Sequence, residues 1–505
     1  MSNFLVKSTL WVTISEIIFN LSGFVVHSAV GRILGPSDYG RYGLVITLTT
    51  MVIILIGNGI PTAMSKYISE VFDTDPARVK IIKKYSVRLQ SLVVAAITVL
   101  FFFLAPVLAK ILGDPSLTRL FQISSLIIPA FAAASFYFSY FTGLHRFGVQ
   151  SFLKISRSVF RIIFIITLAY FFGVEGSIIG YIVVPMSVFF IAYGIDKLKI
   201  TRELKTNVKR METNISSNSP EFAQNSRIAF DWKKLIDYAW QIVLFFLAYE
   251  LLISIDLYLV KGILRDDYLT GIYNASLTVG RIPYYIFYAL TVVLLPVISK
   301  STAENNQEKT AGIISRSLRL MLILLVPSVI LMSIYSQPII EIFYSARYSA
   351  AAFPMSILVW GVGFLTIFYV LCFVMSGANK VKKPMFISII GLIINTALNY
   401  FLIKKYGLAG SAAATSITSA LITFVMLYYI WTDFKVAIRL KNIAKIGLAG
   451  ALMYLASFIF PRENLTFILW SVLLFAFYLF ILYLLREIKK EDLVFLKESL
   501  ARKKK

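Results

Sequence analysis

The hydropathy of the chain rises and falls regularly, with stretches of about 20 apolar residues separated by short polar turns. Because an α-helix rises about 1.5 Å per residue, such a stretch crosses a hydrocarbon layer of roughly 30 Å. No stretch has the period of two that is typical of a membrane barrel. The pattern therefore predicts an all-α, polytopic membrane protein with 14 transmembrane helices. The predicted spans are 9–31, 42–65, 87–109, 119–142, 155–173, 177–196, 236–261, 271–298, 314–335, 351–376, 385–403, 408–431, 443–460 and 465–486.

Several short motifs occur twice in the same order, which indicates an internal duplication. Each copy contains six predicted spans, an even number, so both copies enter the membrane from the same side as parallel repeats. The offset between the copies is about 230 residues. The paired motifs are Ile33-Leu34 with Ile263-Leu264, Asp38-Tyr39 with Asp267-Tyr268, Gly40-x-Tyr42 with Gly271-x-Tyr273, Pro61 and Ser65-Lys66 with Pro296 and Ser299-Lys300, and Gly173-Val-Glu-Gly-Ser177 with Gly407-Leu-Ala-Gly-Ser411.

The duplication and the polar stretches together predict five parts. The stretch between the two halves is rich in Ser, Asn and Pro, which is typical of a flexible linker. The C-terminal tail is basic and is expected to lie on anionic lipid. The parts are an N-terminal six-helix lobe at 1–199, a cytoplasmic linker at 200–231, a C-terminal six-helix lobe at 232–437, a helix pair at 438–487 and a basic cytoplasmic tail at 488–505.

The charge distribution predicts the orientation. The formal net charge is +24, and most of it lies in short loops between the apolar stretches. With a cytoplasmic N-terminus, the inner side carries 39 Lys and Arg residues and the outer side carries 10. The positive-inside rule therefore places both termini in the cytoplasm of a multi-pass protein of the cell (plasma) membrane. Nucleic acid is not expected as a partner, because binding it requires a basic face on a soluble domain.

The residue types exclude most catalytic chemistry. The chain has one Cys, two His, and no HExxH, GxxxxGK[ST] or GxSxG motif. We therefore expect no enzyme activity, no catalytic residues, no metal site and no resident cofactor. Transport by such a protein is expected to draw on coupling to H+ or Na+ rather than on a bound nucleotide.

Polar residues form stripes on several predicted spans. On the first span, Glu16 and Asn20 lie on one helical face with Gly23 and His27. Polar residues inside a membrane span are costly unless they face protein or a watered cavity. The stripes therefore predict a common interior. Its expected lining residues are Asn20, Asn58, Asn274, Thr278, Arg281 and Tyr285.

Three arginines inside or beside spans are candidates for binding an anion. Arg281 falls near the middle of a predicted span, and Arg157 and Arg161 fall near the cytoplasmic end of another. A guanidinium group stays charged and binds phosphate oxygens through two parallel hydrogen bonds. Two alternatives stay open: Arg281 pairs with Glu250 or Asp256, and the other two arginines only anchor their helix at the inner surface.

Three carboxylates inside predicted spans are candidates for carrying a coupling ion. These are Glu16, Glu250 and Asp256. Acidic side chains inside membrane helices mark ion or proton pathways. The alternative is interhelical pairing, with Glu16 near His27 and Glu250 with Arg281.

The sequence resembles a known family over its whole length. The resemblance rests on Gly31-Arg-Ile-Leu-Gly-Pro-Ser-Asp-Tyr-Gly-Arg-Tyr-Gly43, on Gly57-Asn-Gly-Ile-Pro-Thr-Ala-Met-Ser-Lys66, on Gly143-Leu-His-Arg-Phe147, and on Gly173-Val-Glu-Gly-Ser177 with its echo. The family is that of the polysaccharide-export flippases, with stage V sporulation protein B-like members, in the multidrug/oligosaccharidyl-lipid/polysaccharide (MOP) exporter superfamily.

The resemblance implies two six-helix lobes around a central cavity and a cargo of polyprenyl-(pyro)phosphate-linked oligosaccharide. It implies movement of that cargo from the cytoplasmic to the outer leaflet by alternating access. Membrane lipids are expected neighbours, glycan polymerases or transferases are candidate partners, and a monomer is expected. The alternatives are an H+- or Na+-coupled multidrug or metabolite antiporter of the same superfamily, and a non-transporting scramblase or scaffold.

Overall fold

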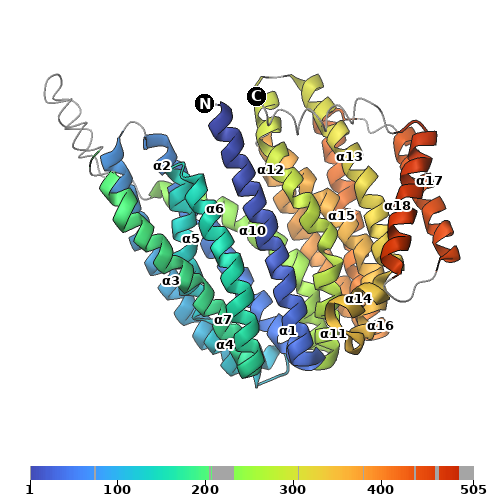
Figure 1. Cartoon of the computed structure of the whole chain (residues 1–505), viewed down its shortest axis with the longest axis horizontal. Helices are drawn as coiled ribbons and strands as arrows, with labels where there is room; N and C mark the ends of the chain where they lie inside the picture. The colour runs from blue at the N-terminus through green and yellow to red at the C-terminus, as the bar shows by residue number, and fades with distance from the viewer. Residues whose placement is uncertain are drawn as a thin grey trace. The chain divides into compact units, whose positions relative to one another are not determined.

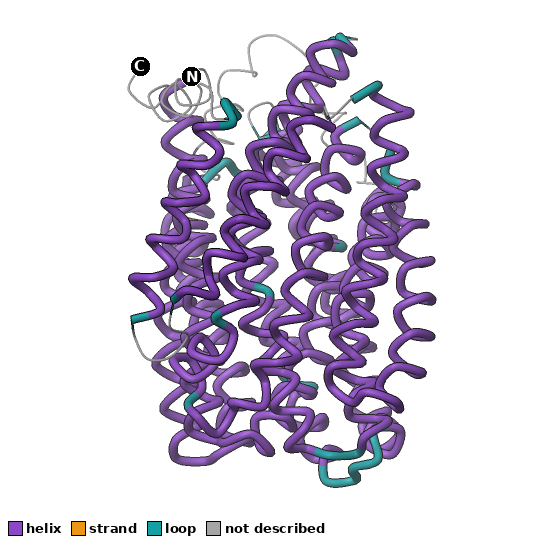
Figure 2. The backbone as a smooth tube through the Cα atoms, turned by 90° about the vertical axis from the view of Figure 1, so that its right-hand side faces the viewer, coloured by secondary structure: helices purple, strands orange, loops and turns teal. Residues whose placement is uncertain are grey.

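In the computed structural model, the structure describes residues 2–72, 75–203, 206, 233–304, 306–378, 380–436, 440–460 and 466–487. Regular structure in these ranges is helical throughout, with no strand among the described residues (Figure 2). The all-α prediction is therefore confirmed. Most of the predicted linker and the whole basic tail lie outside the described residues.

The contacts divide the chain into two compact units. The first unit holds Met1–Leu34 and Arg41–Leu251, and the second holds Gly35–Gly40 and Leu252–Lys505. The predicted part boundaries remain predictions.

The helices of the first unit contact one another mainly through α5 and α7, and α3 and α6 lie beside them (Figure 1). Their apolar core includes Ile68, Tyr140 and Val188, all buried. The elements are α1 (Ser2–Asn58), α2 (Ile60–Val71), α3 (Pro76–Ile111), α4 (Leu117–Ser124), α5 (Ile127–Gly143), α6 (Phe147–Phe160), a π-helical turn (Arg161–Ile165), α7 (Ile166–Ile195) and a second π-helical turn (Asp196–Ile200).

The second unit is organised around α15, which packs along α16, α12 and α13. The helix pair α17 and α18 packs on α13 through a core that includes Ile330, Met453 and Tyr478. The elements are α10 (Lys233–Leu264, shared with the first unit), α11 (Asp267–Gly280), α12 (Ile282–Ala303), α13 (Gln307–Ile334), α14 (Ser336–Tyr344), a 3₁₀ turn (Ala346–Ala351), α15 (Ala352–Gly377), α16 (Lys382–Phe434), α17 (Leu440–Ala456), a 3₁₀ turn (Ser457–Ile459) and α18 (Phe467–Leu484).

Nine helical segments in the described part of the chain are long and apolar enough to cross a membrane. Three of them are 58, 57 and 53 residues long. A straight helix of 58 residues would measure about 87 Å, which is far more than one crossing needs. Each of the three contains a glycine outside the helical region of backbone space: Gly35, Gly173 or Gly407. The sequence count of fourteen spans remains a prediction.

Gly173 and Gly407 carry the same backbone conformation in the two copies of their motif. Their φ and ψ angles are 58° and −137° in one copy and 56° and −133° in the other. A positive φ favours glycine because it has no Cβ. Three residues later, a Cβ on Gly176 would collide with the carbonyl of Leu168, and the same collision would occur at Gly410 with the carbonyl of Leu402. The motif is therefore one structural unit used twice.

The turn after the first predicted span contacts the equivalent turn of the second sequence copy, and both turns belong to the second unit. A Cβ added to Gly40 would collide with the backbone of Asp267 and Gly271, and one added to Gly271 would collide with the carbonyl of Pro36. Gly40 and Gly271 are the equivalent glycines of the two Gly-x-Tyr motifs. The two copies of the motif therefore touch at equivalent glycines, where the backbones are too close for a Cβ atom.

Candidate functional sites

A row of three cations runs along α6 and into the π-helical turn that continues it in the first unit. Lys154, Arg157 and Arg161 are spaced three and four residues apart, so they share one helix face. The guanidinium carbon of Arg157 lies 4.9 Å from the ring centre of Phe19 and 4.8 Å from that of Phe131. We call this row and its partners the arginine cluster. The partners on other helices are Glu16, Phe19, Phe131 and Tyr181.

Arg161 is the last cation of the row and contacts two rings. Its guanidinium carbon is 5.3 Å from the ring centre of Phe19 and 5.6 Å from that of Tyr181. The Nη2 group donates a hydrogen bond of 3.3 Å to the Tyr181 hydroxyl, which in turn bonds the Tyr42 hydroxyl at 2.9 Å. Gly23 leaves room for this arrangement, because a Cβ there would come within 2.8 Å of Arg161 Nη1.

Glu16 pairs with Lys154 rather than with the region of His27. The His27 ring instead contacts Tyr42 edge to face, with ring centres 5.6 Å apart. Among the described residues, Arg157 makes ring contacts but no hydrogen bond or ion pair. Lys154 therefore has Glu16 as a carboxylate partner, and three cations lie together on one helix face.

The structure places the two arginines farther along their helix than the sequence prediction did. We expected them at the cytoplasmic end of a span that starts at residue 155, but α6 begins at Phe147. Arg161 therefore lies about 21 Å along a helix that continues to Gly173. The first turns of α6 are polar, so the apolar window began after them, and the position of the two arginines relative to the membrane stays a prediction. Arg161 also opens a π-helical turn, a feature often found at functional sites.

A second cluster surrounds Asp256 in the second unit, where the carboxylate is fully buried on α10. Its Oδ2 atom accepts hydrogen bonds from the Tyr273 hydroxyl at 3.1 Å and the Thr415 hydroxyl at 3.4 Å. Its Oδ1 atom accepts one from the backbone N–H of Leu257 at 2.9 Å. A buried carboxylate requires such partners, because its desolvation is expensive.

Two buried amides on α16 extend this cluster. Asn395 Nδ2 donates to the carbonyl of Leu252 at 3.2 Å, and Asn399 Nδ2 donates to Asn395 Oδ1 at 2.8 Å. The Ser411 hydroxyl donates to Asn399 Oδ1 at 2.6 Å. We call Asp256, Tyr273, Asn395, Asn399, Ser411 and Thr415 the aspartate cluster. Carboxylate, amide and hydroxyl oxygens are the ligands that hard cations prefer.

The sequence analysis missed the amides and hydroxyls of the aspartate cluster. A usable signal was present, because Asn395 and Asn399 are one turn apart inside an apolar span. Ser411 and Thr415 repeat that spacing in the next span. In the described residues, no group of three or more His, Cys, Asp or Glu side chains could hold a metal ion. A cation here would therefore bind mainly neutral oxygens around one carboxylate.

Arg281 lies at a helix break rather than inside a continuous span. It stands between α11 and α12, next to Gly280 and two residues before Pro283, which lacks a backbone N–H. Its Nη2 group donates to the carbonyl of Ile253 on α10. The charge of Arg281 also interacts with Asp256. Both predicted roles, partner of Asp256 and receiver of an anion, are compatible with this position.

The remaining predicted residues lie on α1, α10, α11 and α12. Asn274 is buried on α11, and the Thr278 hydroxyl donates to its carbonyl at 2.8 Å. Tyr285 is 43% exposed on α12. Three others lie elsewhere: Asn20 is partly buried on α1, Asn58 ends α1 with a side chain outside the description, and Glu250 is partly buried on α10.

Comparison with known proteins gives a consistent result. A family model described as polysaccharide biosynthesis protein matches residues 5–302, and one described as MatE matches residues 242–401. Stage V sporulation protein B of Bacillus subtilis is 22% identical over 96% of each chain. Lipid II flippase MurJ of the same organism is 23% identical over 85% of this chain and 83% of its own. A solved structure of lipid II flippase MurJ in an inward closed conformation has a TM-score of 0.73 at 17% identity, over 95% of this chain and 99% of that chain, which shows a shared fold.

Proposed function

The chain belongs to the polysaccharide biosynthesis protein family, and on that premise we propose that it is a flippase for a lipid-linked oligosaccharide. The cargo moves from the cytoplasmic to the outer leaflet by alternating access. Two of its relatives support this, since one is named a lipid II flippase and another a probable flippase of glycan biosynthesis. The proposal includes fourteen spans in two six-helix lobes and a helix pair, with both termini cytoplasmic in a monomer.

The observation that carries the proposal is the arginine cluster. A polyprenyl-(pyro)phosphate headgroup is anionic, and its many hydroxyls prevent unaided passage through hydrocarbon. Ring faces pack against the guanidinium groups of Arg157 and Arg161. Among the described residues, the N–H groups of Arg157 make no hydrogen bond within the protein. The N–H donors of the two arginines suit phosphate oxygens, and charge-assisted hydrogen bonds of this kind are the strong ones.

The aspartate cluster would hold the ion that drives the cycle. Asp256 is surrounded by oxygen ligands suited to Na+, and it can also take up H+. Moving one charge across the membrane yields about 2.3 kcal/mol per 100 mV, so each cation that enters adds to the free energy available for transport. Glu16 and Glu250 are weaker candidates, because Glu16 is already paired with Lys154.

A cation-coupled multidrug or metabolite antiporter is the second candidate. The MatE family model over residues 242–401 favours it, and so does the buried Asp256. The three neighbouring cations of the arginine cluster argue against it, because an antiporter for cationic compounds needs the opposite sign of charge at its binding site.

Leaflet-resolved analysis of lipid-linked oligosaccharides in cells that lack the protein tests the proposal. Intact cells are treated with a membrane-impermeant oxidant of vicinal diols, which modifies only outer-leaflet glycans. We expect unmodified, inner-leaflet material to accumulate in the deletion strain and to disappear on re-expression. An unchanged leaflet distribution, together with new sensitivity to cationic drugs, would favour the antiporter.

A further inference from the structure

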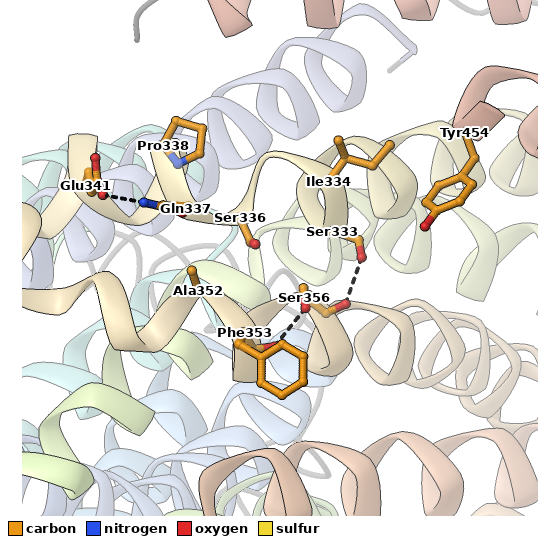
Figure 3. A pocket seen from close by; sticks show the side chains of 10 residues that line it. All are labelled: Ser333, Ile334, Ser336, Gln337, Pro338, Glu341, Ala352, Phe353, Ser356 and Tyr454. Atoms are coloured by element: carbon orange, nitrogen blue, oxygen red, sulfur yellow. Dashed lines mark hydrogen bonds between the residues drawn. The ribbon is translucent and has the colours of Figure 1, made fainter. Parts of the chain in front are cut away.

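A pocket of about 800 Å³ lies in the second unit, where α13, α14, α15 and α17 come together (Figure 3). It contains none of the residues of the aspartate cluster. In the predicted topology, the span at 314–335 runs outward, so the pocket lies on the outer side of the membrane. The proposed transport cycle assigns it no role.

One wall is polar and comes from α14. Gln337 and Glu341 stand on successive turns, and the Gln337 amide donates to a carboxylate oxygen of Glu341 at 3.1 Å. The Ser333 hydroxyl lies at the end of α13, donates to the carbonyl of Ser356 at 2.9 Å, and is 3.2 Å from the indole nitrogen of Trp360. Hydroxyl, amide and carboxylate groups together both donate and accept hydrogen bonds.

Aromatic rings are exposed around the same space. Phe353 is 66% exposed, Trp360 43% and Tyr454 42%. In Figure 3, the hydroxyl of Tyr454 points from α17 across the pocket toward Ser333. Exposed ring faces beside hydrogen-bonding groups offer an apolar surface and a polar surface to one ligand.

Contacts outside the pocket hold the helices of its walls in place. Tyr344, which ends α14, bonds the hydroxyl of Tyr39 at 2.8 Å and packs on Tyr348 with ring centres 5.1 Å apart. On the other side, Gly450 lets α17 approach α13 closely, since a Cβ there would lie 2.9 Å from Val326 and 3.0 Å from Ile330. A preformed pocket lowers the cost of ordering on binding.

We propose that this pocket binds the saccharide of the lipid-linked cargo after it reaches the outer leaflet, an inference that rests on the proposed function. The sugar hydroxyls bond Gln337, Glu341 and Ser333, and the C–H faces of the sugar ring lie on the exposed aromatic rings. The ten lining residues include one carboxylate and no cation. The pocket therefore repels phosphate and accepts the neutral part of the headgroup, the reverse of the preference of the arginine cluster.

Equilibrium binding to the full-length protein in lipid nanodiscs tests the inference. The probe is the mixture of oligosaccharides released by mild acid from the polyprenyl phosphate pool of the host cells and labelled with tritium at the reducing end. We expect saturable binding to the wild type and at least tenfold weaker binding to the Gln337→Ala/Glu341→Ala double variant. Tyr454→Phe, which keeps the ring, should weaken binding by about threefold, the loss of roughly one neutral hydrogen bond.

The matched control is Glu308→Ala, which removes an exposed carboxylate at the opposite end of α13. It should bind the oligosaccharides like the wild type. Absence of saturable binding to the wild type, or equal binding by wild type and double variant, would overturn the inference. Equal competition by phosphatidylglycerol would also overturn it, because it would assign the pocket to lipid headgroups.

The two proposals fail in different ways. If the flippase proposal is wrong, the leaflet assay shows no accumulation whatever the pocket binds. If only the pocket inference is wrong, the arginine cluster variants described below still abolish transport, whereas the pocket variants change neither binding nor transport.

Discussion

The arginine cluster of the first unit and the aspartate cluster of the second unit occupy equivalent positions in the two copies of the sequence. The offset of 234 residues that relates Gly173 to Gly407 also relates Arg161 to Asn395 and Tyr181 to Thr415. The paired Gly-x-Tyr motifs relate Tyr42 to Tyr273. One framework therefore supports a cation-rich cluster in one copy and a carboxylate-centred cluster in the other.

The tyrosines show how this difference is produced. In the first unit, the Tyr42 hydroxyl bonds Tyr181, which accepts a hydrogen bond from Arg161. In the second unit, the equivalent Tyr273 donates to Asp256. A phenol hydroxyl both donates and accepts, so the same residue can stabilise a cation or an anion. The duplicated helices provide the positions, and a few side chains decide the sign of the charge that each cluster carries.

The strongest test of this comparison removes the positive charge of the first unit. Arg157→Gln with Arg161→Gln should lower the rate of glycolipid transport by at least about 100-fold, because each charge-assisted hydrogen bond contributes about 1.5 to 3 kcal/mol. Outer-leaflet oligosaccharide is the measurement. Arg119→Gln is the control, since Arg119 is 74% exposed in its pair with Glu175. Normal transport by the double variant would remove the anion-binding role.

The second test removes the negative charge of the second unit. Asp256→Asn keeps the size of the side chain and should lower transport by about 30-fold, because the coupling cation loses its charged ligand. Any residual transport should no longer respond to a Na+ or H+ gradient across proteoliposomes. A variant that keeps its full gradient dependence would move the coupling site elsewhere.

A third, smaller effect separates the two roles of Arg281. Arg281→Ala should lower transport by about tenfold, the loss of roughly one hydrogen bond to a charged group. The double variant with Asp256→Asn decides the cause, since contacting residues give non-additive effects. If the two losses add, Arg281 receives the anion. If the double variant transports hardly more slowly than the Asp256→Asn variant alone, Arg281 serves as the partner of Asp256.

The smallest expected effect comes from a change at Tyr181, the residue equivalent to Thr415. Tyr181→Phe keeps the ring under Arg161 and removes the hydroxyl that accepts its hydrogen bond. We expect about a threefold rise in the half-saturating glycolipid concentration and an unchanged maximal rate, consistent with the loss of about 0.7 kcal/mol of binding. A fall in the maximal rate instead would indicate that the hydroxyl acts during the conformational change.

The sequence predicted the all-helical class correctly because apolar length and glycine motifs act locally, whereas the count of fourteen spans stays a prediction. The motif at Gly173 and Gly407 marked the same backbone turn in both copies. The sequence also singled out Arg157, Arg161 and Asp256, since a charge within an apolar stretch is conspicuous. Asn395 and Thr415 were missed because neutral polar residues in membrane helices also serve ordinary packing, and only the fold brings Asn395 to the carbonyl of Leu252 and Thr415 to Asp256.

The contact of Gly40 with Gly271 makes two small residues a point of control over the fold. When equivalent residues of two copies touch each other, the contact is isologous, the form found between identical subunits related by a two-fold axis. Neither glycine tolerates a Cβ against the other backbone, so a methyl group at either position would force the two equivalent turns apart.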